Sequence, residues 1–233
     1  ITIFSDFKGT GANNGTITTI SSGGCSKEIT LDFSVIVNPA IISAAPIAST
    51  GGDSSGGDSS GGASSLTDGN ISLIGGICKC PSASVGDTGT INGTVYTVVN
   101  NSTIAGQIAN GNYNLCTTLA TYMTELFYGN SSFNSDISFW DMSNVTNTDR
   151  MFQGASSFNQ NIGGWNTSKF YDVSGMFKSA SSFNQDIGSW DTSRIANMAE
   201  MFNDASSFNQ DLKGWCVSNI ASEPGAFAGN TSS

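Results

Sequence analysis

The sequence predicts a mainly β protein with short helical turns, in which a solenoid of tandem repeats follows a β-hairpin cap and a partial β-sandwich segment. Three observations predict this fold. From Leu126 the sequence repeats every 25 residues without insertion or deletion, and a fixed period of this length is typical of solenoids. Asn92-Gly93 lies between two runs of β-forming residues, as in a tight hairpin. Apolar and polar residues mostly alternate from Leu31 to Val37, which indicates a strand.

These signals divide the chain into four parts. Residues 1–48 are expected to form strands, with Ile1–Ile3 and Ile17–Ile20 as shorter partners of the strand at 31–37. Residues 49–65 form a linker, because Gly, Ser and Asp dominate there and residues 51–65 contain no apolar residue larger than alanine. Residues 66–125 contain the hairpin and the cap of the solenoid, and 126–233 contain the repeats. Because the chain begins at Ile1, we expect it to be a segment of a longer protein.

Within the cap region two further elements are predicted. A short helix is expected at Ser102–Asn110, with the Ser102 side chain capping its first turn. Residues 115–123 fit the frame of the repeats, with Leu115 in the tryptophan position and Ala120 in the Val/Ile position. We therefore expect a half-repeat that closes one end of the solenoid.

Apolar residues recur at fixed positions of the repeat and predict its interior. One position holds all four tryptophans of the chain: Trp140, Trp165, Trp190 and Trp215. A single repeat buries too few side chains to offset the entropy of ordering 25 residues, so neighbouring repeats must share their faces. A polar position recurs as well, and we expect it to form a hydrogen-bonded ladder between coils: Asn134, Asn159, Asn184 and Asn209.

The cysteine positions restrict the possible disulfides. Cys116 and Cys216 are separated by four whole periods, or roughly 19 Å if coils stack at strand spacing, and a disulfide needs Cα atoms within about 7 Å. We therefore expect Cys116 to pair with either Cys78 or Cys80, which would fasten the cap to the first coil. A disulfide favours an oxidising, extracellular setting.

Charge and composition argue against several classes of function. The chain has 8 Lys and Arg against 18 Asp and Glu, a net charge of −10. Nucleic-acid binding needs clustered cations, so no nucleic-acid partner is expected. No apolar run reaches the ~18 residues of a membrane span, so no membrane insertion is expected either.

Catalytic patterns are weak. Gly-x-Ser-x-Gly occurs in the linker at 52–56 and 57–61, but a serine hydrolase needs a histidine base and the chain has none. Paired carboxylates could form a glycosidase site beside a tryptophan, but the corresponding positions in the second repeat are amides. The candidate carboxylates are Asp136, Asp141, Asp186 and Asp191. We expect no enzyme, no catalytic or cofactor-binding residues, and no metal site, with calcium at the aspartates of the repeat or the linker as a minor alternative.

Residues 180–193, Ala-Ser-Ser-Phe-Asn-Gln-Asp-Ile-Gly-Ser-Trp-Asp-Thr-Ser, have near copies at 155–168 and 205–218. This phrase resembles the BspA-like leucine-rich-repeat surface proteins, in their branch with 25-residue repeats. The resemblance implies a leucine-rich-repeat-type solenoid and an exported surface protein. Residues 28–39 resemble, more loosely, the last strand of immunoglobulin-like modules in large bacterial surface and gliding-motility adhesins of the type IX secretion kind.

Together these patterns predict a non-catalytic extracellular module for adhesion or ligand binding within a larger cell-surface protein. A glycan, or a surface or matrix protein, is the expected partner, together with adjacent modules of the same polypeptide. A structural spacer or filament-forming subunit is the alternative, because the ends of a solenoid expose unpaired edges unless they are capped.

Overall fold

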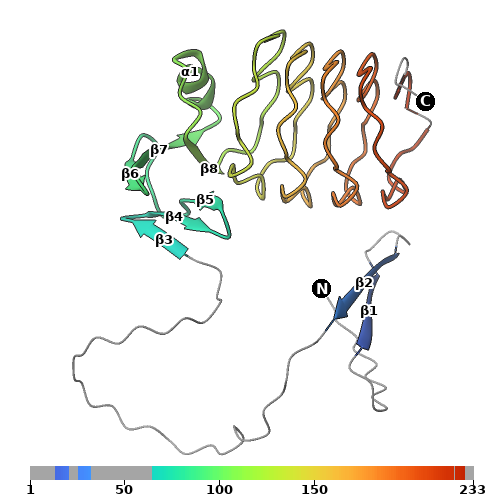
Figure 1. The fold of residues 1–233 in the computed structure, drawn as a ribbon, viewed down its shortest axis with the longest axis horizontal. Coiled ribbons are helices and arrows are strands. Elements are labelled where there is room, and N and C mark those ends of the chain that lie inside the picture. Colours follow the sequence, from blue (N-terminus) through green and yellow to red (C-terminus); the bar gives the residue numbers. More distant parts are fainter. Residues whose placement is uncertain (1–13, 21–25, 33–64, 223, 229–233) are drawn as a thin grey trace, which may run out of the picture. The chain divides into compact units, whose positions relative to one another are not determined.

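The computed structural model describes residues 14–20, 26–32, 65–222 and 224–228. The chain forms two compact units, of which the second contains Ala63–Ser233. Over the described residues the fold is mainly β, with eight strands and one short α-helix (Figure 1). The expected strand at Ile1–Ile3 and nearly all of the linker at 49–65 lie outside the described residues.

The first unit contains a β-hairpin made of β1 (Asn14–Ile20) and β2 (Ser26–Asp32). The strands pair antiparallel over their full length, with Ile17 opposite Ile29. β1 is rich in Thr and Ile, whose branched side chains favour an extended backbone. It includes the strand predicted at 17–20. The strand predicted at 31–37 overlaps β2 only at its first two residues, and the rest lies outside the described residues.

The second unit begins with a three-stranded antiparallel sheet of β3 (Ser65–Asp68), β4 (Ile71–Ile74) and β5 (Ile77–Lys79). Its two turns use Gly69 and the pair Gly75-Gly76, with φ of 59°, 58° and 82°. Glycine adopts these positive values at little cost because it has no Cβ. The three strands are absent from the predicted elements, since three or four residues show too little periodicity.

A second sheet contains the hairpin that the sequence predicts. β6 (Thr88–Ile91) pairs antiparallel with β7 (Thr94–Asn100). Asn92 and Gly93 have φ of 54° and 78°, the positive values that a type I′ turn requires. β7 also pairs in parallel with β8 (Leu115–Leu119), and α1 (Ile104–Ala109) makes the crossover between them.

The predicted cap of α1 is wrong. Thr103 occupies the N-cap position and its side chain makes no capping hydrogen bond. Ser102 instead donates from its backbone N and its Oγ to Asn100 Oδ1, at 3.0 and 2.8 Å. A competing turn centred on Asn100 therefore takes the hydroxyl that the sequence pattern assigned to the helix. Burial of Ile104 and Ile108 anchors the helix.

After β8 the 25-residue repeats form coils that stack side by side (Figure 1). We number these coils 1 to 4, and they comprise residues 126–150, 151–175, 176–200 and 201–225. Isolated parallel bridges connect neighbouring coils along one side, joining Tyr122 to Asn147, Asn147 to Asp172, and Asp172 to Asn197. Backbone hydrogen bonds between coils continue a few residues after each bridge: Phe127 N to Met151 O, Phe152 N to Met176 O, Phe177 N to Met201 O and, shifted by one residue, Phe202 N to Phe227 O.

Aromatic side chains fill the interior of the stack. Two phenylalanines per coil form two continuous columns, whose rings lie nearly parallel between coils. In one column the ring centroids of Phe127 and Phe152 are 5.5 Å apart, and those of Phe152 and Phe177 are 5.7 Å apart. Each fully buried ring stabilises the fold by about 2–3 kcal/mol. The columns link every coil to the next, so the stack has one shared core.

The tryptophan column runs beside the phenylalanines. Trp165 and Trp190 stack with ring centroids 6.4 Å apart, and Trp190 and Trp215 follow at 6.3 Å. Each indole Nε1 also donates to a backbone carbonyl of the preceding coil or of residues 65–125, which we call the lead-in. The acceptors are Tyr113 O for Trp140, Ile137 O for Trp165, Ile162 O for Trp190, and Ile187 O for Trp215. A buried indole thereby keeps its one polar group satisfied. Among the described residues no helix is long and apolar enough to span a bilayer.

Candidate functional site

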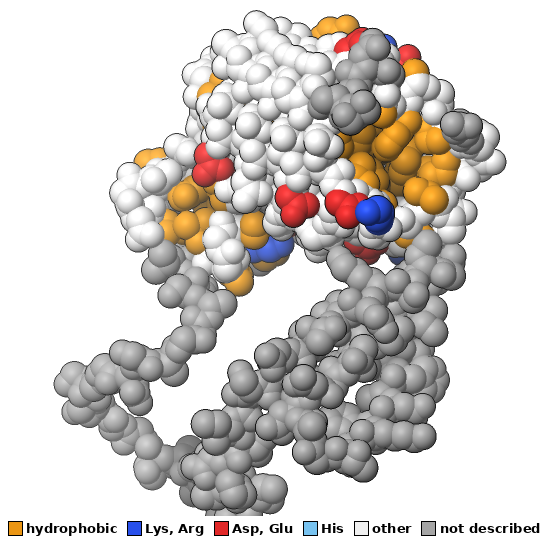
Figure 2. Space-filling view, turned by 45° about the vertical axis from the view of Figure 1, so that its right-hand side comes forward, with side chains coloured by type: hydrophobic (Ala, Val, Ile, Leu, Met, Phe, Trp, Pro, Cys, Tyr) orange, Lys and Arg blue, Asp and Glu red, His pale blue; other side chains and the backbone are white. Residues whose placement is uncertain are grey.

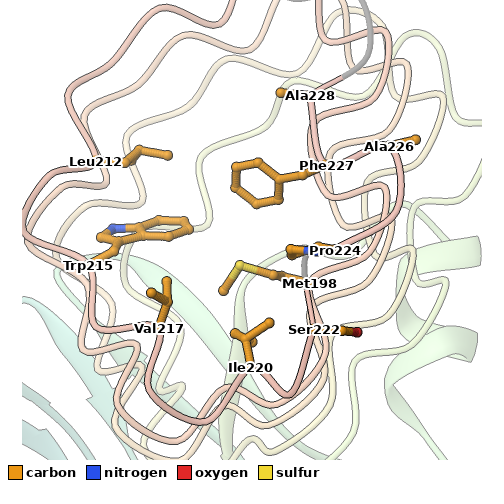
Figure 3. Close-up of a pocket in the computed structure, with 10 residues that line it drawn as sticks. All are labelled: Met198, Leu212, Trp215, Val217, Ile220, Ser222, Pro224, Ala226, Phe227 and Ala228. Carbon is orange, nitrogen blue, oxygen red and sulfur yellow. The ribbon is translucent and has the colours of Figure 1, made fainter.

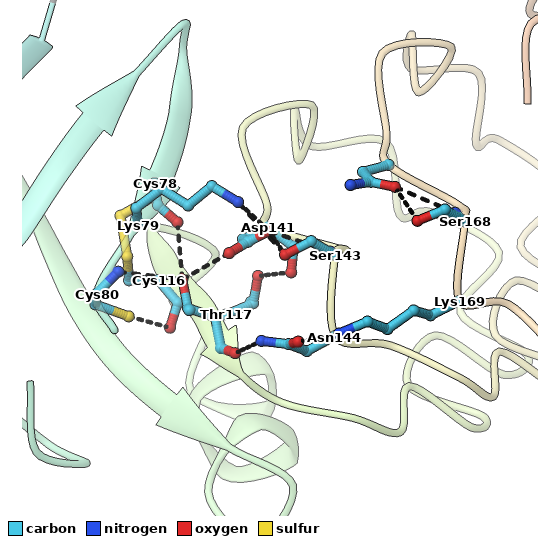
Figure 4. A network of polar contacts seen from close by, with 12 residues as sticks. Cys78, Lys79, Cys80, Cys116, Thr117, Asp141, Ser143, Asn144, Ser168 and Lys169 are labelled. Carbon is cyan, nitrogen blue, oxygen red and sulfur yellow. Dashed lines mark hydrogen bonds and ion pairs between the residues drawn. A yellow bond between two sulfur atoms is a disulfide. The ribbon is translucent and has the colours of Figure 1, made fainter. Parts of the chain in front are cut away.

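Three cysteines meet where the lead-in joins the stack (Figure 4). Cys78 of β5 and Cys116 of β8 form a disulfide with Cα atoms 5.2 Å apart, which is one of the two pairings expected from the sequence. Cys80 is a free, fully buried thiol whose Sγ lies 3.6 Å from Cys116 O. Burial raises the pKa of the Cys80 thiol, despite an opposing hydrogen bond with Thr118. A protonated, buried thiol is chemically inert.

Beside the disulfide, a buried carboxylate connects the lead-in to coil 1. Asp141 is 1% exposed, and its Oδ1 lies 2.6 Å from Lys79 Nζ. Thr118 Oγ1 donates to Asp141 Oδ2 at 2.8 Å, and Ser143 donates through both its backbone N and its Oγ to Oδ1. Burial by itself raises the pKa of Asp141, but the hydrogen bonds from Lys79, Ser143 and Thr118 outweigh it and lower the pKa. The ion pair between Lys79 and Asp141 therefore helps to hold the lead-in against coil 1, at a contact that we call the junction (Figure 4).

The predicted asparagine column lies on the surface and links the coils. Asn159 N donates to Asn134 Oδ1 at 2.9 Å, Asn184 N to Asn159 Oδ1 at 3.0 Å, and Asn209 N to Asn184 Oδ1 at 2.9 Å. A glutamine follows each asparagine except Asn134, and its Nε2 donates to the same acceptor: Gln160 to Asn134 Oδ1, Gln185 to Asn159 Oδ1, and Gln210 to Asn184 Oδ1. The side-chain oxygens of Asn134, Asn159 and Asn184 thus accept hydrogen bonds from the backbone and from the glutamine of the next coil.

The carboxylates considered for glycosidase chemistry form turns. Each accepts the backbone N–H two residues later: Ser138 N for Asp136, Ser143 N for Asp141, Gly188 N for Asp186, and Ser193 N for Asp191, at 2.9–3.1 Å. Asn161 and Asn166 make the same contact in coil 2, which explains why an amide replaces a carboxylate there. In the described ranges no group of three or more His, Cys, Asp or Glu side chains could hold a metal ion.

A groove on the bridged side of the stack combines exposed aromatic rings with positive charge. We call it the tyrosine groove, and it has a volume of about 440 Å³ and is lined by Tyr122, Thr146, Asn147, Lys169, Tyr171 and Arg194. Tyr122 is 56% exposed and Tyr171 is 60% exposed. Tyr122 precedes coil 1 and Tyr171 belongs to coil 2, so the smaller Thr146 and Asn147 of coil 1 lie between them.

The cations of the tyrosine groove occupy one position of the repeat. Asn144, Lys169, Arg194 and Asn219 share this position in coils 1 to 4. Lys169 Nζ donates to Asn144 Oδ1 at 2.7 Å. Among the described residues neither Lys169 nor Arg194 forms an ion pair with a carboxylate. The groove thus offers two neighbouring positive charges on a chain whose net charge is −10.

Comparison with known proteins places one family on this part of the chain. Residues 121–233 match the family described as "Mycoplasma protein of unknown function, DUF285". The matched region begins at the bridged strand position of Tyr122 and includes all four coils and the whole tyrosine groove. No curated protein and no solved structure gives a significant match.

At the C-terminal end of the matched region the apolar interior opens to the surface. A pocket of about 860 Å³ is lined mainly by apolar side chains: Met198, Leu212, Trp215, Val217, Ile220, Ser222, Pro224, Ala226, Phe227 and Ala228. Figure 3 shows the larger of these side chains pointing toward one another: Met198, Leu212, Trp215, Val217, Ile220 and Phe227. Figure 2 shows hydrophobic surface gathered at this end. Trp215 stacks on Trp190 on one face, and its other face borders the pocket.

Sequence analysis identified some residues of the junction, the core and the groove in advance and missed others. The cysteines, tryptophans and asparagines that it singled out lie in the junction, the core and the ladder. Tyr122 and Tyr171 were missed, as was the pairing of Lys79 with Asp141. A signal for the groove exists in the repeat itself, because Lys169 and Arg194 replace the asparagine that coils 1 and 4 have, and Tyr171 stands at a position that holds only threonine or alanine in the other coils.

Proposed function

We propose that this chain is a non-catalytic extracellular surface module for adhesion or ligand binding within a larger cell-surface protein. The tyrosine groove carries the proposal. Two tyrosines with more than half of their surface exposed leave amphipathic rings available for contact, and Tyr and Arg are enriched at recognition surfaces. Thr146 and Asn147 in the same lining supply hydrogen-bonding groups.

We further propose that the repeat stack is a leucine-rich-repeat-type solenoid of the BspA-like kind. Support comes from the 25-residue period, the single parallel bridge per coil and the shared aromatic core. The disulfide between Cys78 and Cys116 supports an extracellular, cell-surface location, because such bonds persist in oxidising compartments. The proposal includes that this chain is one module of a larger adhesin of the type IX secretion kind, and that the adjacent modules of the same polypeptide are its partners.

The proposed function is tested by screening the 1–233 segment against an array of glycans and matrix proteins, with calcium and with chelator. Wild-type protein is expected to bind at least one ligand, and Tyr171→Thr is expected to lose that binding. Threonine occupies the same repeat position at Thr121 and Thr146, so this variant keeps the local fold. A segment that binds nothing on the array, or a Tyr171→Thr variant that binds as well as wild type, would falsify the groove's role.

A structural spacer or filament subunit is the second candidate, and the apolar C-terminal pocket favours it. That end could stack against another chain, since the same face buries each inner coil against its neighbour. The other end of the stack is covered by β7, β8 and α1 (Figure 1), which would limit simple head-to-tail growth. Light scattering over a concentration series tests this function. Monomers throughout would exclude it, whereas association that Trp215→Ala abolishes would support it.

A further inference from the structure

We propose that the tyrosine groove binds an acidic carbohydrate, a saccharide that carries a carboxylate or a sulfate. Tyr122 and Tyr171 would pack against sugar rings, and Lys169 and Arg194 would pair with the acid group. The inference rests on the proposed binding function and adds the chemical class of the ligand.

The cations stand where the repeat otherwise needs an asparagine. Asn144 Nδ2 donates to Thr118 O at 2.9 Å, and Asn219 Nδ2 donates to Ser193 O, so this position ties one coil to the previous one. Coils 2 and 3 replace the asparagine with Lys169 and Arg194, which line the groove. Those coils lack the amide that bonds a carbonyl of the previous coil, and two exposed charges stand in its place. Lys169 still reaches the previous coil, since its Nζ donates to Asn144 Oδ1.

Two like charges in neighbouring coils repel each other, and an anion held between them removes that repulsion. Arginine can hold a carboxylate or sulfate through two parallel hydrogen bonds, and lysine adds a point charge. The carboxylate of Asp172, which follows Tyr171, does not serve as the counter-ion. It accepts from Ser174 N and Ser174 Oγ through Oδ1 and from Asn197 Nδ2 through Oδ2.

The backbone around the groove disfavours a peptide ligand. Thr146 N donates to Thr121 O, Tyr171 N to Thr146 O, and Ala196 N to Tyr171 O, at 2.8–2.9 Å. These groups are therefore not available to pair with an added strand. The groove lining consists of two tyrosines, two cations, Thr146 and Asn147, and it includes no aliphatic residue that would hold a hydrophobic side chain. Sugar rings suit this surface, because their C–H faces pack on aromatic rings while their hydroxyls reach polar groups.

The experiment is isothermal titration of the 1–233 segment with paired probes at physiological salt. The probes are an oligouronate and its carboxyl-reduced form, a sulfated oligosaccharide and its desulfated form, and a poly-glutamate peptide. The double variant Lys169→Asn/Arg194→Asn removes the cations and restores the residue found at Asn144 and Asn219. Lys213→Asn is the charge control, because Lys213 is 92% exposed at its side chain and is not among the groove residues.

We expect an acidic saccharide to bind, its neutral counterpart to bind at least about tenfold more weakly, and the double variant to lose at least about tenfold in affinity. Lys213→Asn should bind as wild type. The response to the uronate and sulfate pairs identifies which acid group is recognised. Equal binding of acidic and neutral forms, unaffected by the double variant, overturns the acidic class and leaves the proposed function standing.

Two other outcomes also overturn the inference. Poly-glutamate binding with the same affinity and the same dependence on Lys169 and Arg194 would show that any polyanion suffices and would exclude carbohydrate recognition. Failure of every saccharide to bind excludes a carbohydrate ligand. In that case, a matrix protein bound on the array through Tyr171 would still support the proposed function.

Discussion

Lys79 Nζ lies 2.6 Å from Asp141 Oδ1, although the two residues are 62 positions apart in the chain. The ion pair joins β5 to coil 1 and lies one residue after Cys78, which forms the disulfide with Cys116 of β8. Thr118 of β8 accepts from Cys80 N through its hydroxyl and donates from the same hydroxyl to Asp141 Oδ2. Backbone hydrogen bonding from Cys78 N to Phe139 O, at 2.8 Å, completes the contact. The lead-in is thus fixed to the first coil by charge, hydrogen bonds and a nearby disulfide.

We expect Lys79→Met to lower the free energy of unfolding by about 2–4 kcal/mol, because Asp141 would keep a buried charge without its cation. Urea titration followed by tryptophan fluorescence measures this loss, since all four tryptophans belong to the repeat stack. Asp141→Asn is the matched control, because Asn166 makes the same turn one coil later. It should lose less, and the double variant should lose less than the sum. A Lys79→Met loss no larger than that of Asp141→Asn contradicts the prediction.

The same carboxylate should make stability depend on acid pH. The pKa of Asp141 is lowered in the folded protein, whereas an unfolded aspartate titrates at about 3.9. A lowered pKa stabilises the folded state above the unfolded value, and that contribution disappears as pH falls through the folded value. We expect the stability difference between wild type and Asp141→Asn to be constant above about pH 5 and to shrink below about pH 4. Urea midpoints measured from pH 2.5 to pH 7 give the answer, and a difference independent of pH would count against it.

The cysteines of the junction should differ in reactivity. Without reductant, peptide mapping is expected to recover Cys78 linked to Cys116, and Cys80 as a thiol. Cys80 should resist iodoacetamide until the protein is denatured, because it is fully buried and its pKa is raised. Cys78→Ser should lower stability by about 2–4 kcal/mol, whereas Cys80→Ala should cost less. Recovery of a Cys80–Cys116 peptide from freshly purified protein would contradict this pairing.

Two adjacent glycines provide a test of coil packing. A Cβ built on Gly163 would lie 2.5 Å from the backbone oxygen of Asp186 in the next coil, whereas a Cβ on Gly164 meets nothing within 4 Å. We expect Gly163→Ala to destabilise the stack by about 1–3 kcal/mol, because the clash involves backbone that cannot turn aside. Gly164→Ala should change stability by less than about 0.5 kcal/mol. Thermal and urea unfolding of the two variants compare them directly, and equal stabilities would mean that the coils are less closely spaced.

Replacing the groove cations should leave the fold intact. Lys169→Asn and Arg194→Asn place in coils 2 and 3 the residue whose amide bonds a carbonyl in coils 1 and 4. We expect Arg194→Asn to be as stable as wild type or more stable by up to about 1 kcal/mol, since a hydrogen bond is gained and like-charge repulsion is removed. Lys169→Asn should stay within about 1 kcal/mol of wild type, because it exchanges the bond from Lys169 to Asn144 for the new one. Urea midpoints check this expectation. A loss of more than about 1 kcal/mol would indicate that the cations have a structural role.

The sequence predicted those parts of the fold that depend on short-range pattern. Asn92-Gly93 defined its hairpin because few residues accept two consecutive positive φ values. The period of 25 residues identified the interior tryptophans, because identical positions in stacked coils face the same environment.

Contacts between residues far apart in the chain could not be predicted from the sequence. Nothing near Lys79 in the sequence points to Asp141, and Ser102 was assigned to a helix cap that Asn100 prevents. The tyrosine groove is an intermediate case. Tyr122 and Tyr171 each depart from what their repeat position holds elsewhere, but only the structure shows that these departures fall beside those at Lys169 and Arg194.

The uneven ends of the stack also imply a mechanical polarity. The disulfide and the ion pair secure the lead-in end, while the far end exposes its interior. A pulling force applied at the C-terminus should therefore peel coils away in order, starting with coil 4, and each coil should release roughly 80–90 Å of extended chain. In a single-molecule trace this would appear as a series of equal steps that stops at the lead-in, so the module would yield gradually under tension instead of breaking at once.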